Sequence, residues 1–235
     1  VQGYANHSVS DHALALMLAC VRSLRPGMEH MRPRYNLPAD LHMPELHELT
    51  LGIVGLGRIG GTLCAKARGL FNRVVACDPY IPADRFTELG AEACPFDALL
   101  ALSDVVSLHC NLTEETRHLM NARAFARMRP FAIVINTARG PVVDEQALTV
   151  ALEAGKVFAA GIDVFEEEPP GNDRDPLLSH PRVVATGHYA WYSERAGREL
   201  QRRAAVNMEA MLLGEFPADC LNREGLAGKA GKGCA

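Results

Sequence analysis

The side chains best suited to chemistry follow three apolar runs in the second half of the chain. They are Arg139, Glu168 and His188. A guanidinium binds a carboxylate through two parallel hydrogen bonds and keeps its charge at any physiological pH. An imidazole takes up and releases a proton near neutral pH, and a neighbouring carboxylate stabilises its charged form and fixes its tautomer. These residue types predict a site that binds an acid and moves a proton.

Each of the three residues also has a purely structural interpretation. An arginine after a strand is often a surface residue, and His188 is compatible with a hydrogen-bonded structural histidine. Glu168 ends the run Glu166–Glu168, which is typical of a solvated charged segment, and spacing alone does not separate it from its neighbours. The functional interpretation is favoured by their joint placement after successive strands, because parallel strands end at one edge of a sheet.

A glycine-rich segment earlier in the chain predicts a dinucleotide site. The run Leu51–Gly60 reads LGIVGLGRIG, which is an apolar strand, a tight turn and the start of a helix. Gly55 allows the turn, Gly57 lets the backbone approach a pyrophosphate, and Gly60 lets the helix pack against the strand. Asp78 follows the next apolar run, where a carboxylate binds a ribose 2′-hydroxyl, so NAD is favoured over NADP. The alternative is a glycine-rich turn in another Rossmann-like fold.

Together, the two sets of residues predict hydride transfer between NAD and a 2-hydroxy or 2-keto acid. Arg139 would hold the carboxylate of the acid and polarise its carbonyl group. His188 would exchange the hydroxyl proton, and Glu168 would orient and stabilise the imidazole ring.

Apolar runs alternate with helical segments from Leu51 onward. This pattern predicts an α/β fold with a doubly wound, mostly parallel sheet of the Rossmann type. Ser10 is expected to cap a helix over Asp11–Leu24 that Pro26-Gly27 ends, and Ser193–Leu213 is expected to form a long helix with one buried apolar stripe. Strands are expected over 51–54, 73–77, 105–109, 133–136, 158–164 and 183–186.

Composition narrows the classes of partner and location. The 235 residues carry a net charge of −4, so nucleic acid and anionic membranes are not expected partners. The apolar run Ala13–Val21 is too short to span a bilayer. Seven cysteines without a CxxC pair favour a reducing cytoplasm over a disulfide framework, and the nine scattered histidines form no metal-binding motif.

The chain resembles the D-isomer-specific 2-hydroxyacid dehydrogenase family from about Asp11 to about Asn222. In that family the arginine of an Asn-Thr-Ala-Arg-Gly motif, the glutamate before a proline and the histidine after the last strand form the catalytic set. The resemblance therefore implies catalytic roles for Arg139, Glu168 and His188. It rests on Gly-Leu-Gly-Arg-Ile-Gly with Asp78-Pro79-Tyr80, on 108–113 (LHCNLT), 135–144 (INTARGPVVD) and 161–165 (GIDVF), and on Glu168-Pro169.

The resemblance also implies how the cofactor and the substrate are held. The segment His188–Glu194 is most similar to the C-terminal-binding-protein-like branch, in which a tryptophan lies over the substrate pocket, so Trp191 is an expected substrate contact. The expected NAD contacts are Gly55, Gly57, Arg58, Ile59, Gly60, Asp78, the loop from Cys110 and Asn111 to Thr116, then Thr137, Ala138, Arg139, Asp163 and His188.

Two positions depart from the family pattern. Gly187 replaces the usual proline before the histidine and relaxes the backbone there, and Tyr189 is larger than the usual residue and narrows the pocket. The chain begins after the segment that builds most of the family's substrate domain, so most of that domain is expected to be absent. The parts implied are a dimer arm and connection (1–46), the NAD-binding domain (47–190), and a returning helix with a flexible tail (191–235).

The resulting expectation is an NAD-dependent oxidoreductase that acts on a D-2-hydroxy acid or a 2-keto acid. The resemblance implies a homodimer, and we expect no direct nucleic-acid or membrane partner. Two alternatives stay open: an NAD-sensing dimeric interaction protein, like the corepressors of the branch, and an NAD-binding but catalytically incomplete fragment. The sequence does not name the acid.

Overall fold

The computed structural model describes residues 1–31, 42–171 and 175–223. The chain divides into two units. The larger one is Asn6–Ala190, and the smaller one combines Val1–Ala5 with Trp191–Ala235.

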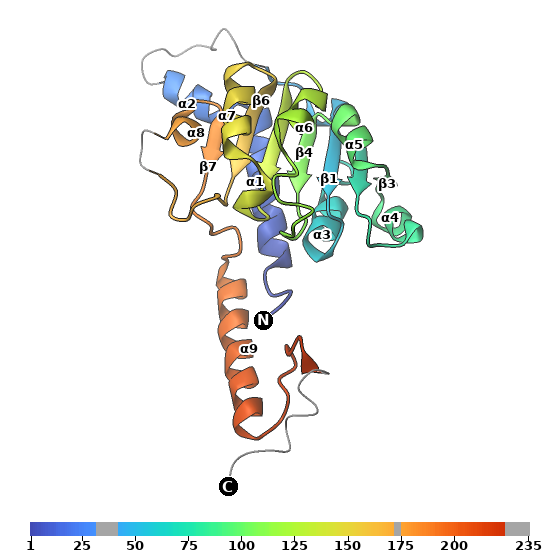
Figure 1. Ribbon diagram of the computed structural model, residues 1–235, viewed down its shortest axis with the longest axis vertical. Coiled ribbons are helices and arrows are strands. Elements are labelled where there is room, and N and C mark those ends of the chain that lie inside the picture. Colours follow the sequence, from blue (N-terminus) through green and yellow to red (C-terminus); the bar gives the residue numbers. More distant parts are fainter. Residues whose placement is uncertain (32–41, 172–174, 224–235) are drawn as a thin grey trace. The chain divides into compact units, whose positions relative to one another are not determined.

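The larger unit is built on a single parallel sheet with the strand order β3-β2-β1-β4-β5-β6-β7 (Figure 1). The order runs outward in both directions from β1, so the predicted doubly wound Rossmann fold is confirmed. The six predicted strands are present within one or two residues at their ends. The bounds are β1 Thr50–Val54, β2 Arg73–Cys77, β3 Glu92–Ala93, β4 Val105–Leu108, β5 Ala132–Asn136, β6 Val157–Ile162 and β7 Val183–Ala185.

The strand register brings distant parts of the chain to one edge. Val54 at the end of β1 pairs with Cys77 and Leu108, which end β2 and β4. The same level continues through Asn136 and Ile162 to the end of β7. The residue after each of these six strands therefore lies at the carboxyl edge of the sheet, and these residues are Gly55, Asp78, His109, Thr137, Asp163 and Thr186.

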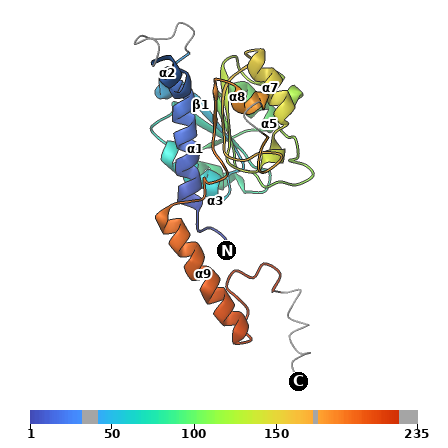
Figure 2. The ribbon, with the colours of Figure 1, turned by 90° about the vertical axis from the view of Figure 1, so that its left-hand side faces the viewer.

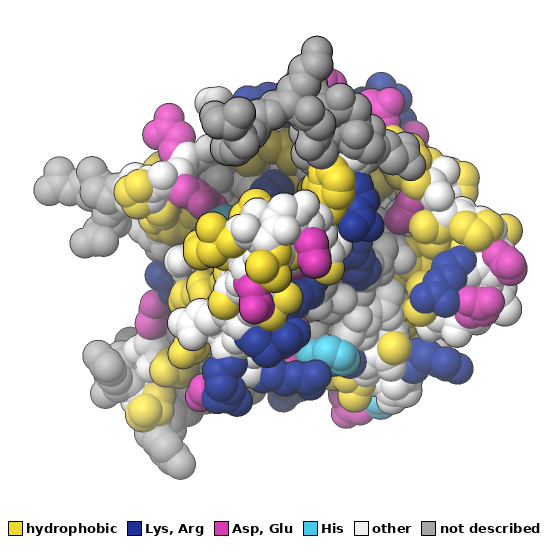
Figure 3. Space-filling view, turned by 90° about the horizontal axis from the view of Figure 1, so that it is seen from below, with side chains coloured by type: hydrophobic (Ala, Val, Ile, Leu, Met, Phe, Trp, Pro, Cys, Tyr) yellow, Lys and Arg dark blue, Asp and Glu magenta, His cyan; other side chains and the backbone are white. Residues whose placement is uncertain are grey.

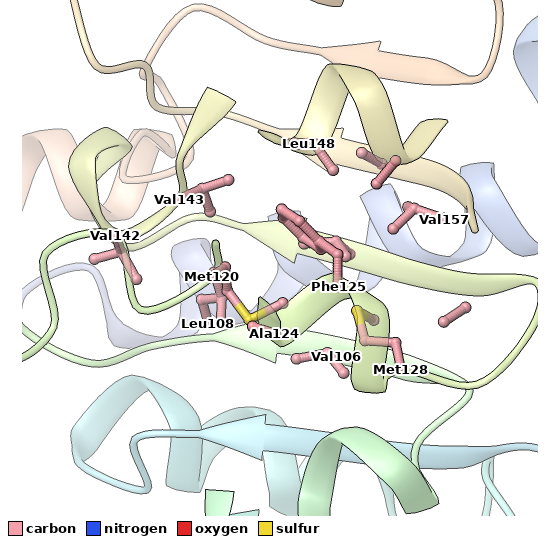
Figure 4. Close-up of a cluster of buried hydrophobic side chains, with 14 of the residues drawn as sticks. Val106, Leu108, Met120, Ala124, Phe125, Met128, Val142, Val143, Leu148 and Val157 are labelled. Carbon is pink, nitrogen blue, oxygen red and sulfur yellow. The ribbon is translucent and has the colours of Figure 1, made fainter. Parts of the chain in front are cut away.

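Helices cover both faces of this sheet, and the strands are buried because each face carries its own apolar cluster (Figure 2). Phe125 and Leu148 belong to the cluster drawn in Figure 4, where they pack with strand residues such as Val106 and Val157. On that face lie α5 Phe96–Leu102, α6 Ala122–Arg127, α7 Glu145–Glu153 and α8 Pro176–Ser179. On the other face lie α1 Asn6–Val21, α3 Arg58–Ala67 and α4 Ala83–Leu89.

The first helix differs from its prediction at both ends. It begins at Asn6, so Ser10 is not its cap but a buried residue whose hydroxyl donates to the His7 carbonyl at 2.9 Å. Ser23, with φ of 47°, separates it from α2, which spans Leu24–Met31. Pro26 does not end a helix because it lies in the first turn of α2, where a backbone N–H has no partner within the helix.

The smaller unit contains one long helix, α9 (Glu194–Leu212), within the range predicted for it, and the Ser193 side chain caps this helix by accepting the Ala196 N–H. Its predicted buried stripe is wrong, since Ala196 is the only buried residue of α9. Leu212 is 82% exposed, and Val206, Met208 and Met211 are also exposed. Within this unit the polar side supplies the contacts instead: Arg203 bonds Asp219 and the Gln2 carbonyl, and Asn207 also bonds Asp219.

Candidate active site

The glycine-rich turn has the geometry that its sequence predicts. Gly55 has φ of +89°, and a Cβ atom there would lie 2.6 Å from the backbone nitrogen of Cys110. A Cβ on Gly60 would lie 2.0 Å from the Gly55 carbonyl oxygen, so α3 approaches β1 as closely as it does only because this residue is glycine. A Cβ on Gly57 would meet nothing within 4 Å, which leaves open space beside the backbone of the turn.

The residues around this turn fit a dinucleotide. Gly57 caps α3 without a side-chain hydrogen bond, so an anion can approach the first-turn N–H groups at the positive end of the helix dipole. Asp78 lies beside the turn, because its Oδ2 accepts the Leu56 N–H at 2.8 Å while Oδ1 accepts the Tyr80 N–H at 3.0 Å. Each oxygen keeps a lone pair for a ribose hydroxyl.

Further along the carboxyl edge, His188 and Glu168 form a hydrogen-bonded pair. The His188 Nδ1 atom lies 2.5 Å from Glu168 Oε2, and the two side chains are 45% and 36% exposed. The other oxygen of Glu168 accepts the Phe165 N–H at 3.1 Å, which fixes the carboxylate. Nδ1 is therefore engaged, and the exposed ring offers Nε2 to a ligand.

Arg139 lies close enough to this pair for its charge to act on Glu168. Partial burial raises the pKa of Glu168, but the hydrogen bonds from His188 and Phe165 and the charges of His188 and Arg139 outweigh burial and lower it. The Arg139 side chain is exposed, and one guanidinium nitrogen donates to the Ala138 carbonyl at 2.6 Å. The structure thus pairs His188 with Glu168 and places the charge of Arg139 within electrostatic reach of Glu168, and the catalytic roles of the three residues stay predictions.

The structure separates Glu168 from its acidic neighbour Glu166, which sequence spacing did not do. Glu166 accepts a hydrogen bond from the Glu145 N–H at 3.0 Å, and its own N–H donates to Glu145 Oε1 at 2.7 Å. The second carboxylate oxygen of Glu166 lies 3.0 Å from His118 Nε2. Glu166 therefore ties its segment to α7 and to the loop after β4, whereas Glu168 faces the histidine of the site.

Asp163 is 1% exposed and holds the loop that carries His188. Its Oδ1 accepts the Thr186 hydroxyl at 2.6 Å and the Tyr189 N–H at 3.1 Å, while Oδ2 accepts the Ala190 N–H at 2.9 Å. The His188 N–H also donates to the Asp163 carbonyl at 2.8 Å. These contacts hold the loop at the carboxyl edge, and the predicted cofactor contact of Asp163 stays a prediction.

Of the other predicted cofactor residues, Arg58 and Ile59 begin α3, and the rest occupy two loops at this edge. After β4, the Thr116 hydroxyl donates to the Asn111 carbonyl at 2.6 Å, which closes the loop that follows Cys110. After β5, the Ala138 N–H donates to Asn136 Oδ1 at 3.0 Å, and the buried Thr137 hydroxyl has no partner. An unpartnered buried hydroxyl at the carboxyl edge suits a site that completes its hydrogen bonds on a ligand.

Trp191 belongs to the smaller unit. Its ring meets the rings of Tyr4 and Tyr192 edge-on, at centroid distances of 6.3 and 5.5 Å. Its predicted contact with a substrate stays a prediction. Hydrophobic, basic, acidic and histidine side chains are all exposed on the side of the molecule seen in Figure 3, so charge alone does not mark the site.

Sequence reasoning did not single out His109, which follows β4 at the carboxyl edge. Its Nε2 lies 2.8 Å from the Ser107 hydroxyl, and its buried Nδ1 has no partner. Burial lowers the pKa of His109 to about 4 from 6.5. The signal available in the sequence was the position of His109 directly after an apolar strand, which indicates a buried side chain.

His109 makes stability depend on pH. Because the native ring binds its proton only near pH 4 and the unfolded ring near pH 6.5, its contribution is complete above pH 6.5 and is lost as the pH falls toward 4. Relative to a His109→Gln variant, the protein should lose roughly 3 kcal/mol of unfolding free energy over that window. Urea unfolding at pH 7, 6, 5 and 4 measures this, and parallel pH profiles for both proteins would disprove it.

The part of the chain that the structure describes lacks two features, a metal-binding cluster and a membrane-spanning helix. No group of three or more His, Cys, Asp or Glu side chains is arranged to hold a metal ion there. No helix within those residues has both the length and the apolar character needed to cross a bilayer.

The comparisons with known proteins agree with this geometry. The model of the family described as "D-isomer specific 2-hydroxyacid dehydrogenase, NAD binding domain" matches residues 14–190. The chain belongs to this family. It carries the NAD-binding domain, and the glycine turn, Asp78 and the open space beside Gly57 are the features that fit NAD.

Individual relatives show that the chain spans only part of the length of the family's proteins. It is 38% identical to the glyoxylate reductase of Korarchaeum cryptofilum, covering 94% of this chain and 68% of the relative. It is 37% identical to the D-3-phosphoglycerate dehydrogenase of Mycobacterium leprae, covering 93% and only 41%. The structure of the Aquifex aeolicus D-lactate dehydrogenase complexed with NAD and lactic acid is similar, with a TM-score of 0.84, 30% identity and coverage of 92% and 69%.

Proposed function

We propose that the protein is an NAD-dependent oxidoreductase that interconverts a D-2-hydroxy acid and its 2-keto acid. The observation that carries this proposal is the His188–Glu168 pair at 2.5 Å, with the charge of Arg139 acting on the same carboxylate. Relatives with 38% identity are a glyoxylate reductase and a hydroxypyruvate reductase. An imidazole hydrogen-bonded to a carboxylate, with the charge of a guanidinium acting on the same carboxylate, is an arrangement that suits proton exchange with a bound acid.

Each side chain has a distinct role in this proposal. NAD, when bound, supplies or accepts the hydride. Arg139 binds the carboxylate of the substrate and polarises its carbonyl group through its planar fork of N–H donors. His188 gives a proton from Nε2 to the carbonyl oxygen in the reductive direction and takes it back in the oxidative one, while Glu168 bonds Nδ1, fixes the tautomer and stabilises the charged ring.

We propose small 2-keto acids as substrates, with Trp191 as a contact to their side chain. The direct test is oxidation of NADH by the protein with glyoxylate, hydroxypyruvate and pyruvate, followed at 340 nm. Turnover with at least one of them is the expected result. Binding of NADH without turnover of any 2-keto acid would contradict the proposal and favour the two alternatives, an NAD-sensing protein or a catalytically incomplete fragment.

Asp78 sets the preference for NAD in this proposal, because a carboxylate binds the ribose hydroxyls and repels a 2′-phosphate. We expect Asp78→Asn to weaken NAD binding about 10- to 100-fold, through loss of a charged hydrogen bond, and to reduce discrimination against NADP. The amide oxygen can still accept one of the two backbone N–H groups that Asp78 bonds. Titration of NADH and NADPH by fluorescence checks this, and an unchanged NADH affinity would remove Asp78 from the ribose site.

We also propose that the protein is a cytoplasmic homodimer. The face of α2 supports an interface, because Leu24, Met28 and Met31 are 50%, 70% and 56% exposed. Six cysteines of the described residues are free thiols, as a reducing compartment allows. Sedimentation equilibrium of the protein and of a Met28→Glu variant tests the dimer, and a monomeric parent would contradict it.

A further inference from the structure

Beneath the proposed catalytic loop, three side chains from distant elements form a hydrogen-bonded cluster. His12 of α1 approaches Thr186, which follows β7, with 2.9 Å between Nε2 and the hydroxyl oxygen. The same hydroxyl lies 2.6 Å from Oδ1 of the buried Asp163 after β6. The His12 ring is 18% exposed, and its Nε2 is 3.6 Å from the same carboxylate oxygen.

The chemistry of this cluster fixes the direction of its hydrogen bonds. An ionised carboxylate only accepts, so the Thr186 hydroxyl donates its single proton to Asp163. The other available acceptor, the Ile162 carbonyl, is 3.5 Å away. With its proton used, Thr186 must accept from His12, and the His12 Nε2 atom must therefore carry a hydrogen. The chain of donors runs from His12 through Thr186 to Asp163.

The cluster contacts the loop of His188 in two ways, through Asp163 and through His12. Asp163 accepts the N–H groups of Tyr189 and Ala190 with its side chain and that of His188 with its backbone. The His12 ring also packs edge-on against the Tyr189 ring, with 5.3 Å between centroids and 78° between planes. His12 therefore contacts both the carboxylate that holds the loop and the residue that follows His188.

We propose that His12 is a positioning residue that holds His188 in its working orientation through Thr186 and Asp163. This inference rests on the proposed function in one respect: the working orientation is the one in which His188 exchanges a proton with the substrate. The backbone of His188 needs such support, because its φ of 54° is left-handed and unfavourable for a residue with a Cβ atom. Gly187 before it adds freedom rather than restraint.

The test compares His12→Phe with His12→Gln in the protein without ligand. Phenylalanine keeps a ring beside Tyr189 but removes the donor, whereas the glutamine amide places an N–H near the position of Nε2. Hydrogen exchange of the 188–190 amides, measured by NMR, should accelerate at least about tenfold in His12→Phe and return close to the parent rate in His12→Gln. Exchange in the core strand β5 should stay unchanged in both variants, which separates local positioning from general destabilisation.

Two further variants complete the design. Thr186→Val removes the relay without touching α1 and should accelerate exchange of the same three amides, so the proposal stays testable even if His12→Phe does not fold. His47→Phe, on a 72% exposed side chain, is the matched control and should change nothing. If the 188–190 amides exchange at the parent rate in His12→Phe or in Thr186→Val, or if His12→Gln accelerates them as much as His12→Phe does, the proposal is wrong.

The rate of 2-keto acid reduction then distinguishes a failure of this inference from a failure of the proposed function. If the parent reduces 2-keto acids, His12→Phe should lower kcat about tenfold or more with an NADH affinity within about twofold of the parent. If the parent turns over none of them, the proposed function fails. The exchange measurement still decides whether His12 holds the loop.

Discussion

We expect the His188→Ala variant to lose turnover by about 10²- to 10⁴-fold, the usual contribution of a general acid/base, while it still binds NADH within a few-fold of the parent affinity. The physical reason is that His188 presents the Nε2 atom to the substrate while Glu168 bonds Nδ1. Stopped-flow reduction of a 2-keto acid gives the rate, and a fluorescence titration gives the NADH affinity.

The control for this prediction is His47→Ala, because His47 is 72% exposed and precedes the start of β1, whereas the site lies where the strands end. A Glu168→Gln variant keeps an oxygen that accepts a hydrogen bond but removes the charge that stabilises the protonated ring. Because the pKa of Glu168 is lowered, its charge persists as the pH falls through the ordinary range of a glutamate. We therefore expect protonation of Glu168 to lower the activity only at pH values below that range.

Full turnover by His188→Ala would contradict the acid/base role.

The second large effect is expected at Arg139. Arg139→Ala should lower kcat/KM for the 2-keto acid about 10²- to 10³-fold, because it removes the charged partner of a bound carboxylate. Arg139→Lys should fall between this variant and the parent, since lysine keeps the charge but loses the planar fork of donors. Steady-state kinetics with saturating NADH separates KM from kcat.

Arg123→Ala is the matched control for Arg139, because Arg123 is an exposed arginine on α6 at the outer surface. Its kinetics should equal those of the parent. If Arg139→Lys and the parent give the same kcat/KM, the bidentate contact is not made. If Arg139→Ala weakens NADH binding as strongly as it weakens use of the acid, the guanidinium serves the cofactor rather than the substrate.

Much of the sheet could be predicted because its strands are continuous apolar runs between helices, as in any parallel sheet covered on both faces. The misses have physical reasons. The two residues of β3, Glu92 and Ala93, are exposed and carry no apolar pattern. The start of α1 at Asn6 was missed because Ser10 has the residue type of a cap but lies buried within the helix. The apolar side of α9 was predicted to be buried from periodicity alone, which does not show whether a packing surface exists.

The residues of the candidate site also divide into those that local sequence patterns predict and those that they do not. The glycine turn and Asp78 are local signals, since a strand, a turn and a helix start follow one another directly in the chain. The pairing of Glu168 with His188 depended on the family resemblance, because three adjacent glutamates look alike in sequence. The cluster of His12, Thr186 and Asp163 joins residues up to 174 positions apart, and no local pattern predicts such a contact.

The central claim is that Arg139, Glu168 and His188 act on one acid beside the nicotinamide of NAD. A crystal structure of the protein with NADH and oxamate, an unreactive mimic of a 2-keto acid, tests it most directly. We predict that oxamate lies next to the nicotinamide, with its carboxylate on Arg139 and its carbonyl oxygen about 3 Å from His188 Nε2. Oxamate bound away from these residues, or a nicotinamide that His188 does not reach, would contradict the account.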